Sequence, residues 1–573
     1  MALVPLAAII VGDPVASANP DFSTDIQQHT AAEYAPLPYY VGDSLWFTVL
    51  QVAYNQPPTY VAEAKLANTW FEDFYNRIHV NPSSFELGNL STEQVREIEV
   101  WNAWLVPQTL SSAEIINGDG LDVTLPGATP LEWRPLQSRF IELNIATDGG
   151  ATIDAQLVLT FTDLDAITIP ITGARVFLWP LPADWAQGVR ESLEWLTGVQ
   201  RSIDGSRDVE PQREFPRREF SIDYVAGAKD RRIIENAMFN WTGRIWSLPV
   251  FPEIELLAAA LPAASAAIPM PGGTAGLDFA EGGQVALWSA IDDYELVELA
   301  AAGVEAYQLL LARPTLKTWP AGTRVYPTRQ ARLQSAPQLA RKSSQVIRFS
   351  ASFDIDEPCD WPAVAPSATY LGIPVLEQRG EESKDPQAAY GRQLEVLDGS
   401  VGLVEVADIT GYAWPTQSQA WRLYGRDERA AHRSLLYWLA GRAQTLWLPT
   451  WTDDLELIEP AGAPGSLLTV AWAGVTKFLG GAQGRRHVRI ELYDGTVFYR
   501  RVEASEELDA QRERIVLDPN LGQALSPEQV RSISWMALSA QASDRAQIEH
   551  LTDSHGVADC EITFEGTPAE EPA

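Results

Sequence analysis

Residues that commonly bind metals or move protons are few in this chain and lie far apart. The six histidines form no His-Glu-x-x-His motif and no comparable array of metal ligands. His550 and His555 are five residues apart and close to Asp553 and Asp559, a set of side chains that could hold a metal ion. The competing interpretation is a solvated loop, which the surrounding sequence favours. We therefore expect no metal site.

No motif for a nucleophile or a cofactor stands out either. The sequence lacks the Gly-x-Ser-x-Gly turn of hydrolases, the Gly-Lys-Ser/Thr phosphate loop and the dinucleotide fingerprint. The adjacent carboxylates Asp453 and Asp454 suggest a glycoside hydrolase pair, but neighbouring residues on a strand point to opposite faces. Cys359 and Cys560 are too few for a disulfide framework or a zinc site, so reduced, structural thiols are expected. We predict that the protein is not an enzyme and has no cofactor.

Size and charge exclude other classes. A chain of 573 residues corresponds to about four domains. Its 42 Lys and Arg residues against 76 Asp and Glu residues give a net charge of −34, which argues against tight binding of nucleic acid through its phosphates. No apolar run approaches the roughly 20 residues of a membrane-spanning helix, so no membrane insertion is expected.

The chain begins with a segment that shows little sustained periodicity. Residues 1–95 are rich in Pro, Asn and Tyr, and we interpret them as an N-terminal arm and docking segment. The stretch Leu3–Gly12 resembles the apolar part of a secretion signal, but the first basic residue is Lys65. We therefore expect a protein that folds and assembles in a cytoplasm.

Residues 96–183 carry the pattern of a β-sandwich of immunoglobulin type. Short alternating runs, such as Phe140-Ile141-Glu142-Leu143 and Ala155 to Phe161, are separated by Asp-Gly and Gly-Gly turns. Strands of this length and spacing are typical of two-sheet sandwiches.

Further along, the chain repeats a helix followed by a strand. The first copy runs from Asp230 to Arg244 and continues as Trp246-Ser247-Leu248-Pro249, and the second runs from Glu428 to Arg442 and continues as Leu446-Trp447-Leu448-Pro449. Each helix of about three turns ends at a glycine suited to the left-handed position after a helix. An aromatic, apolar strand then follows.

The resemblance between the two copies continues downstream in the same order. Each copy has an alternating strand before a turn, at Asp292-Asp293 or at Asp494-Gly495, and closes on a β-rich run, Val346 to Ile355 or Val557 to Phe564. Chance could produce one such pair, but the shared order indicates a duplication. Each unit is mostly β with one helix, of a size suited to a small barrel that the helix flanks.

These motifs resemble those of a known family. Phe215 to Phe220 in the first copy, and Gly441-Arg442 through Leu448 to Leu455 in the second, resemble the barrel of distal-tail and tail-tip proteins of long-tailed bacteriophages. Upstream, Tyr75 to Val80 resembles virion structural proteins of Mu-like phages. The first copy departs from the family pattern at Ser247, where an aromatic residue is usual, and by an insertion at Leu257 to Gly276.

The resemblance implies a fold and a function. The expected fold is mainly β, with an immunoglobulin-like sandwich followed by two tandem tail-tube-like β-barrels at 184–361 and 362–573, each with a flanking helix. The implied function is a structural ring around the DNA channel of a tail tip or baseplate, which connects the tail tube to hub or fibre proteins. A trimer with a pseudo-sixfold ring is favoured, and a hexamer is possible. The implied location is the tail end of the virion, after assembly in the host cytoplasm.

The helix of each barrel is the natural place for a contact with a neighbouring barrel. The candidate interface residues are Met238, Phe239, Trp241, Leu436, Tyr437 and Leu439. The alternative is that these apolar side chains fill the core of their own barrel. The basic pairs Arg217-Arg218, Arg231-Arg232 and Arg485-Arg486 are expected to form salt bridges with acidic neighbours.

Two further questions stay open at the level of sequence. The acidic runs Asp292 to Glu295 and Glu503 to Asp509 are candidates for lining the DNA channel, or they are solvated outer faces. The alternative function is a host-surface adhesin that binds carbohydrate or protein, since abundant Tyr and Trp suit sugar stacking as well as large interfaces. The duplication favours the ring, because ring assembly gives two barrels a geometric purpose.

Overall fold

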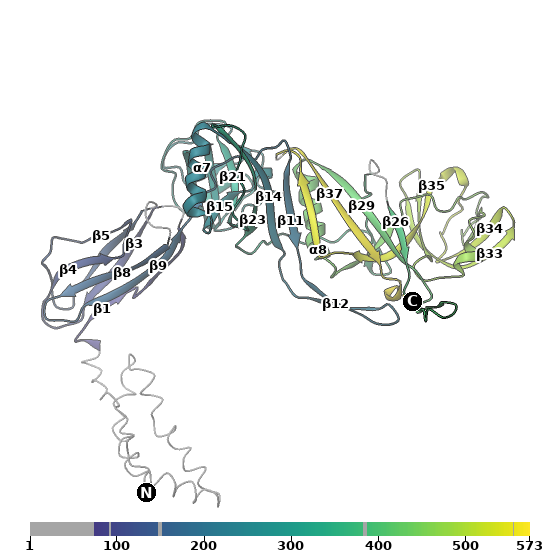
Figure 1. Ribbon diagram of the computed structural model, residues 1–573, viewed down its shortest axis with the longest axis horizontal. Coiled ribbons are helices and arrows are strands. Elements are labelled where there is room, and N and C mark those ends of the chain that lie inside the picture. Colours follow the sequence, from purple (N-terminus) through teal and green to yellow (C-terminus); the bar gives the residue numbers. More distant parts are fainter. Residues whose placement is uncertain (1–73, 91–92, 147–151, 382–386, 554, 573) are drawn as a thin grey trace, which may run out of the picture. The chain divides into compact units, whose positions relative to one another are not determined.

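A computed structural model describes residues 74–573 except 91–92, 147–151, 382–386, 554 and 573 (Figure 1). The fold is mainly β, as the sequence predicts. The chain divides into two compact units, Met1–Val176 and Phe177–Ala573. Most of the predicted N-terminal arm, residues 1–73, lies outside the described residues. No helix in the described ranges combines the length and the hydropathy needed to span a membrane.

The first unit is a sandwich of two sheets (Figure 1). One sheet has the order β1 (Ile78–Asn81), β3 (Gln94–Asn102), β7 (Ser138–Ile145), β5 (Leu121–Thr124). The other has the order β2 (Phe85–Leu90), β9 (Ile167–Arg175), β8 (Thr152–Phe161), β4 (Gln108–Ile116), β6 (Leu131–Trp133). Alternate residues of β8 are buried between the sheets, as the period of a strand requires. Trp133 is fully buried there and donates from Nε1 to the Val100 carbonyl at 3.2 Å.

The boundary expected at residue 96 differs from the structure. β1 pairs with β3 and β2 pairs with β9, so residues 78–90 are part of the sandwich rather than of an arm. These strands have only four and six residues, which is too short for alternation to be recognised beside a run of turn residues.

The second unit contains two repeats. The first repeat, residues 189–355, consists of β11 (Val189–Glu194), β12 (Thr197–Arg201), β13 (Arg207–Pro211), β14 (Arg217–Gly227), α7 (Ala228–Trp241), β15 (Ile245–Pro249), β16 (Glu255–Leu256), β17 (Ala267–Pro269), β18 (Gln284–Ala290), β19 (Asp293–Glu305), β20 (Gln308–Leu311), β21 (Arg324–Leu333), β22 (Ala340–Arg341) and β23 (Val346–Ile355). A short strand, β10 (Phe177–Leu178), precedes it and pairs in parallel with β15.

The second repeat covers residues 388–566. It consists of β26 (Ala388–Gly391), β27 (Leu394–Leu397), β28 (Glu405–Asp408), β29 (Trp414–Tyr424), α8 (Gly425–Leu439), β30 (Thr445–Pro449), β31 (Leu467–Ala471), β32 (His487–Leu492), β33 (Val497–Asp509), β34 (Arg512–Asp518), β35 (Val530–Gln541), β36 (Arg545–His550) and β37 (Val557–Gly566). The linker between the repeats holds the small pair β24 (Thr369–Tyr370) and β25 (Ile373–Pro374).

The strands of the two repeats pair in the same way, as a duplication predicts. In the first repeat β14 pairs with β23, β15 with β21, and β18 with both β19 and β21. In the second repeat β29 pairs with β37, β30 with β35, and β32 with both β33 and β35. The hairpin β12–β13 likewise has a counterpart in β27–β28.

The pairing also sets which residues correspond. From the hairpin to the start of the helix, corresponding residues are 197 apart in number: Thr197 lies opposite Pro211, and Leu394 lies opposite Asp408. Both helices begin at a residue with positive φ, Ala228 at 45° and Gly425 at 75°. This register differs by one residue from an alignment of Gly243 with Gly441.

Two separate barrels were expected, but one continuous sheet of 22 strands runs through both repeats. The physical reason is β11, which pairs with β14 on one edge and with β36 of the second repeat on the other. Among the described residues, the paired strands of neither repeat close into a complete barrel. The boundaries expected at 184 and 362 therefore separate segments that share one sheet.

Candidate assembly interface

The contact between the two repeats is made first by the backbone of β11. Glu191 of β11 lies opposite Phe220 of β14 on one side and opposite Ile548 of β36 on the other. Six residues of β11 pair on both edges, so the junction has the hydrogen bonding of a sheet interior.

A buried carboxylate ties this strand to both repeats. The Glu191 side chain is inaccessible to solvent. It accepts hydrogen bonds from Arg218 Nε at 2.8 Å, from Arg433 Nη2 at 3.0 Å and from His550 Nε2 at 2.8 Å. Arg218 belongs to the first repeat, and Arg433 and His550 belong to the second. A single carboxylate thus binds side chains from both repeats.

The electrostatic surroundings keep this carboxylate ionised. Burial alone would raise the pKa of Glu191, but the nearby Arg218 and Arg433 guanidinium groups outweigh it and hold the pKa well below its usual range. Burial lowers the pKa of His550, and the hydrogen bond to Glu191 only partly opposes this. Asp278 is also buried, yet Arg218 and Arg329 lower its pKa to about 2.

The helix α8 of the second repeat packs on a loop of the first repeat through three arginines. Arg433 Nη1 donates to Glu253 Oε1 at 2.8 Å, and Arg429 Nη1 donates to the Pro252 carbonyl at 3.3 Å. Arg426 pairs with Glu255 and donates to the Gly273 carbonyl at 3.0 Å.

A second segment of the first repeat, which follows β17, also lies close to α8. At Gly276, which has φ of 75°, a Cβ atom would lie 2.9 Å from Arg426 Cγ. Glycine is therefore needed there both for the backbone conformation and for the approach of the helix.

The hairpin β12–β13 of the first repeat extends over the second repeat (Figure 1). The Thr197 amide donates to Asp544 Oδ2 at 2.9 Å. Arg201 pairs with Glu565 at 2.9 Å, and its guanidinium lies over the Trp414 ring at 4.9 Å. The hairpin therefore forms the third part of the junction, beside the β11 edge and the α8 face.

The counterparts of these three parts are exposed in the single chain. All four residues of β26 are exposed, and within the described residues this strand pairs only with β29. Every residue of β27 and β28 is exposed as well. The exposed apolar side chains of this second hairpin and its loop are Leu394, Val396, Leu397, Val401, Leu403, Val404 and Val406.

The outward face of α7 is likewise uncovered. Lys229, Arg232, Asn236 and Phe239 recur at helical spacing and are exposed, Phe239 to 94%. The residues 197 positions later in α8 are Arg426, Arg429, Arg433 and Leu436, and all of these are buried. The same helix face is thus covered in one repeat and open in the other.

The six predicted interface residues fall into three groups. Phe239 is exposed, as an interface residue would be. Met238 and Trp241 are half-buried and pack against the core of the first repeat, whereas Leu436 and Leu439 are fully buried in a cluster that also contains Leu193 and Trp195 of the first repeat. Met238 and Trp241 thus pack on their own repeat, and Leu436 and Leu439 lie in a core to which both repeats contribute.

Tyr437 also lies at the contact between the repeats. It is half-buried, its hydroxyl donates to the Cys359 carbonyl at 3.0 Å, and its ring meets the edge of Trp195 at 5.7 Å. Trp195 belongs to the first repeat and Cys359 to the segment that follows it. Tyr437 of the second repeat therefore contacts both of these segments.

Sequence reasoning missed the buried carboxylates Glu191 and Asp278 and the arginines of α8. It did predict a salt bridge for each basic pair, and Arg218, Arg231 and Arg486 form one. A usable signal for Glu191 is its place in β11 between the apolar residues Val189 and Leu193, which lie two positions away on either side and share its face of the strand.

The acidic runs are bound to neighbouring cations in several places. Asp292 pairs with Lys229 and Asp293 pairs with Lys317, and buried Glu295 accepts from Trp319 Nε1 at 2.8 Å. In the second run Asp509 pairs with Arg512 at 2.8 Å. Whether other carboxylates of these runs line a channel stays a prediction.

The residues considered for chemistry have structural partners. Asp453 and Asp454 accept from the backbone amides of Ile533 at 3.2 Å and Trp535 at 2.8 Å. His550 is buried against Glu191, whereas His555 is exposed. Within the described ranges, no group of three or more His, Cys, Asp or Glu side chains could hold a metal ion.

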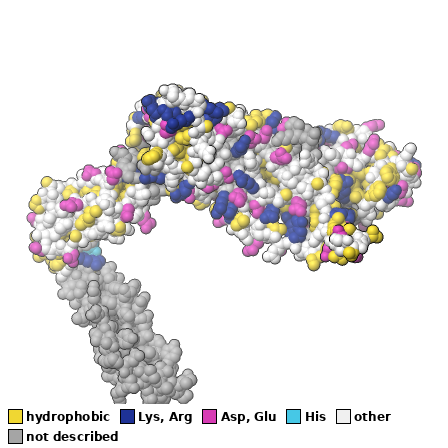
Figure 2. All heavy atoms as spheres, in the orientation of Figure 1, with side chains coloured by type: hydrophobic (Ala, Val, Ile, Leu, Met, Phe, Trp, Pro, Cys, Tyr) yellow, Lys and Arg dark blue, Asp and Glu magenta, His cyan; other side chains and the backbone are white. Residues whose placement is uncertain are grey.

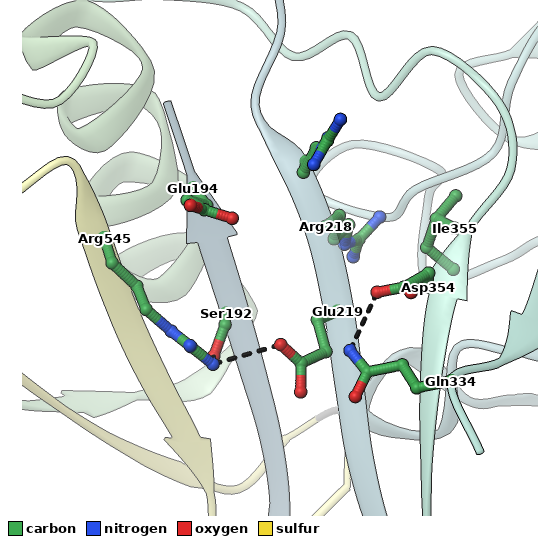
Figure 3. Close-up of a pocket in the computed structure, with 9 residues that line it drawn as sticks. Ser192, Glu194, Arg218, Glu219, Gln334, Asp354, Ile355 and Arg545 are labelled. Atoms are coloured by element: carbon green, nitrogen blue, oxygen red, sulfur yellow. Dashed lines mark hydrogen bonds and ion pairs between the residues drawn. The ribbon is translucent and has the colours of Figure 1, made fainter. Parts of the chain in front are cut away.

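A groove of about 360 Å³ lies beside the junction and is lined by paired charges (Figure 3). Arg545 donates to Glu219 at 3.0 Å and to Ser192 at 2.9 Å, and Gln334 donates to Asp354 at 2.8 Å. Of the residues that line this groove, one, Ile355, is apolar, whereas small-molecule sites are lined predominantly by apolar side chains. The chain matches no family model, and no curated protein is significantly similar to it.

Proposed function

We propose that this protein is a ring-forming structural component of a bacteriophage tail tip or baseplate. It surrounds the DNA channel and connects the tail tube to hub proteins or fibres. The observation that carries the proposal is the directed junction between two repeats, in which the leading parts of the first repeat bind the trailing parts of the second.

A directed contact of this kind is heterologous, and such contacts form a closed ring when the rotation between successive units closes. One chain already contains one such contact and leaves the matching surfaces of its outer ends exposed. Three copies supply six repeats, which supports a trimer with a pseudo-sixfold ring.

The charge of the protein supports a conduit for DNA. A net charge of −34 raises the energy of prolonged contact with a phosphate polyanion, so DNA would pass without being held. The sandwich of the first unit would serve as a docking module for a neighbouring tail protein.

Immunogold labelling of intact phage particles that encode this chain tests the proposal. Antibodies against the full chain are expected to label the tail end that lies away from the capsid. Absence of the protein from purified virions, or labelling confined to the capsid, would contradict it. The adhesin alternative predicts instead that purified protein binds host cells and blocks phage adsorption, which the ring proposal does not require.

A further inference from the structure

We propose that the exposed edge of β26 in one copy pairs with the exposed edge of β22 in a second copy, in the register that joins β11 to β36 within the chain. This inference rests on the proposed ring and names the surfaces that form it. The partner is a second copy because both halves of the contact are present in every chain.

The first argument is the correspondence of the edges. β26 lies beside β29 as β11 lies beside β14, and β22 lies beside β23 as β36 lies beside β37. β11 and β36 pair with each other, whereas β26 and β22 are exposed. Unpaired strand edges are templates for another strand, so the two open edges are matched in kind and direction.

The correspondence also predicts a register. In the chain, Arg190 of β11 lies opposite Glu549 of β36. The residue that corresponds to Arg190 is Gln387. Arg348 of β23 corresponds to Asp559 of β37, and these two residues lie opposite Ala340 and Glu549. Ala340 therefore corresponds to Glu549. Gln387 and Ala340 are both exposed and would lie directly opposite each other.

The second argument is charge. Within the chain, the arginines of α8 bind acidic residues of the loop that follows β15, Glu253 and Glu255. On α7 the corresponding face carries Lys229 and Arg232. Figure 2 shows Lys and Arg side chains gathered over the region of α7.

The loop that would meet this face in the second copy is acidic. After β30, Asp453 and Glu456 occupy the positions that Glu253 and Leu256 occupy after β15. Asp453 and Glu456 are both exposed. The individual internal pairs are not repeated, because Arg433 and Glu253 correspond to Asn236 and Asp453, and Arg426 and Glu255 correspond to Lys229 and Leu455. What the two junctions share is a basic helix face opposite a loop with exposed carboxylates. Complementary charges of this kind set orientation and register at interfaces.

The third argument is the second hairpin. It has the same length as the first, and its Asp398 corresponds to Arg201, which binds Glu565 and Trp414. In a second copy the corresponding positions are Asp354 and Arg217, which line the groove in Figure 3. Two acidic residues, Asp398 and Asp354, take the places of Arg201 and Glu565, and Arg217 takes the place of Trp414. Asp398 would therefore pair with Arg217, and its exposed apolar neighbours would be covered by the adjacent copy.

Cysteine cross-linking of the full chain tests the register. A double variant with Gln387→Cys and Ala340→Cys is oxidised and run on a non-reducing gel. Residues directly opposite on paired strands are close enough for a disulfide. Linked dimers and trimers are therefore expected. The native Cys359 and Cys560 are buried and should form no cross-links between copies. Each single variant, and Gln387→Cys combined with Ser350→Cys on the neighbouring strand, should give at least tenfold less product.

Charge reversal tests the helix face independently of the strand edge. Arg232→Glu, which leaves the Lys229–Asp292 pair of the same chain intact, is expected to weaken association at least tenfold in sedimentation at moderate salt, and adding Glu456→Lys should restore at least threefold of that loss. Reversal of Arg96 and Arg134, exposed on the sandwich, is the matched control and should have no effect.

The outcomes separate the interface from the ring. Closed rings in electron micrographs without cross-linking of the double variant would overturn the interface and leave the ring function standing. Cross-linked but open chains would support the interface and contradict the ring. A protein that stays monomeric and uncross-linked at high concentration would contradict both.

Discussion

At the scale of single residues, the junction depends on Glu191. This carboxylate is buried among Arg218, Arg433 and His550, which come from a strand of the first repeat, a helix of the second and the strand β36. Charges buried in this way are stable only while every partner is present, because removal of one leaves another uncompensated in a medium of low polarity.

Substitution of this residue tests that dependence. Glu191→Gln keeps the shape but removes the charge, so two guanidinium groups lose a buried counterion. We expect the free energy of unfolding of the second unit to fall by about 3 kcal/mol in urea titrations. Glu549→Gln, on the half-buried side chain of the adjacent strand that pairs with Arg190 at 3.8 Å, is the control for a weak, partly solvated ion pair. A loss below about 1 kcal/mol for Glu191→Gln would contradict the role assigned to it.

A buried histidine gives a second prediction at this scale. His432 packs against Trp421 with ring centroids 5.0 Å apart, and burial lowers its pKa to about 4 from an ordinary 6.5. Below pH 6.5 the unfolded chain binds a proton that the folded chain does not, so stability falls as the pH falls from 6.5 to 4. The contribution is about 3 kcal/mol.

The measurement is the free energy of unfolding at several pH values in that range. His432→Phe should lose most of this contribution, while the exposed His555→Gln should keep the wild-type slope. His487, whose pKa burial and two nearby arginines lower to about 3, keeps part of the acid sensitivity in both variants. An unchanged slope in His432→Phe would show that His432 is not buried in its neutral form.

The sequence predicted salt bridges for the basic pairs but not the identity of their partners. Arg218 binds Glu191 across a sequence separation of 27 residues, and Arg433 binds the same carboxylate across a separation of 242 residues. Periodicity and motif spacing contain no information at such separations, because the contact exists only after β11 has paired with both repeats.

At the scale of elements, each helix starts where a strand turns through a residue with positive φ. The second repeat has glycine there, Gly425, and the first has Ala228. An alanine in this conformation is strained by its Cβ atom, whereas glycine is not.

Exchanging the two residues tests this interpretation in both directions. Ala228→Gly should raise the free energy of unfolding by less than about 1 kcal/mol, and the unfolding temperature should rise slightly with it. The gain is small because the greater freedom of glycine in the unfolded chain partly offsets the strain that is relieved. Gly425→Ala has space for its Cβ atom but should cost about 1 kcal/mol. Calorimetry in which Ala228→Gly lowered the unfolding temperature and Gly425→Ala raised it would contradict the account of these turns.

Elements with strong local signals were predictable, and elements defined by distant pairing were not. Apolar spacing and the glycines that follow predict both helices and their following strands. The left-handed conformation expected after each helix is present at Ala440 and Gly441 but not at Gly243. The short strands β1 and β2 cannot be told from an irregular arm, because four to six residues give too little alternation. The long pairing of β11 with β36 was missed for a different reason, since its two strands lie more than 350 residues apart.

At the scale of the whole molecule, duplication was visible in the sequence but its consequence was not. Two independent barrels were expected, and the structure has one sheet through both repeats. The single strand β11 accounts for the difference. This strand leads into the hairpin of the first repeat and pairs with the edge strand β36 of the second repeat. The chain therefore contains, between its own repeats, the kind of contact that would join successive copies in a ring.

The most direct test of the ring is the shape of the assembled protein. Averaged electron micrographs of the purified full chain, with native mass measurement on the same sample, are expected to show a closed ring of three copies with six similar lobes around an open centre. A monomer at every concentration, or an open filament of copies, would contradict it.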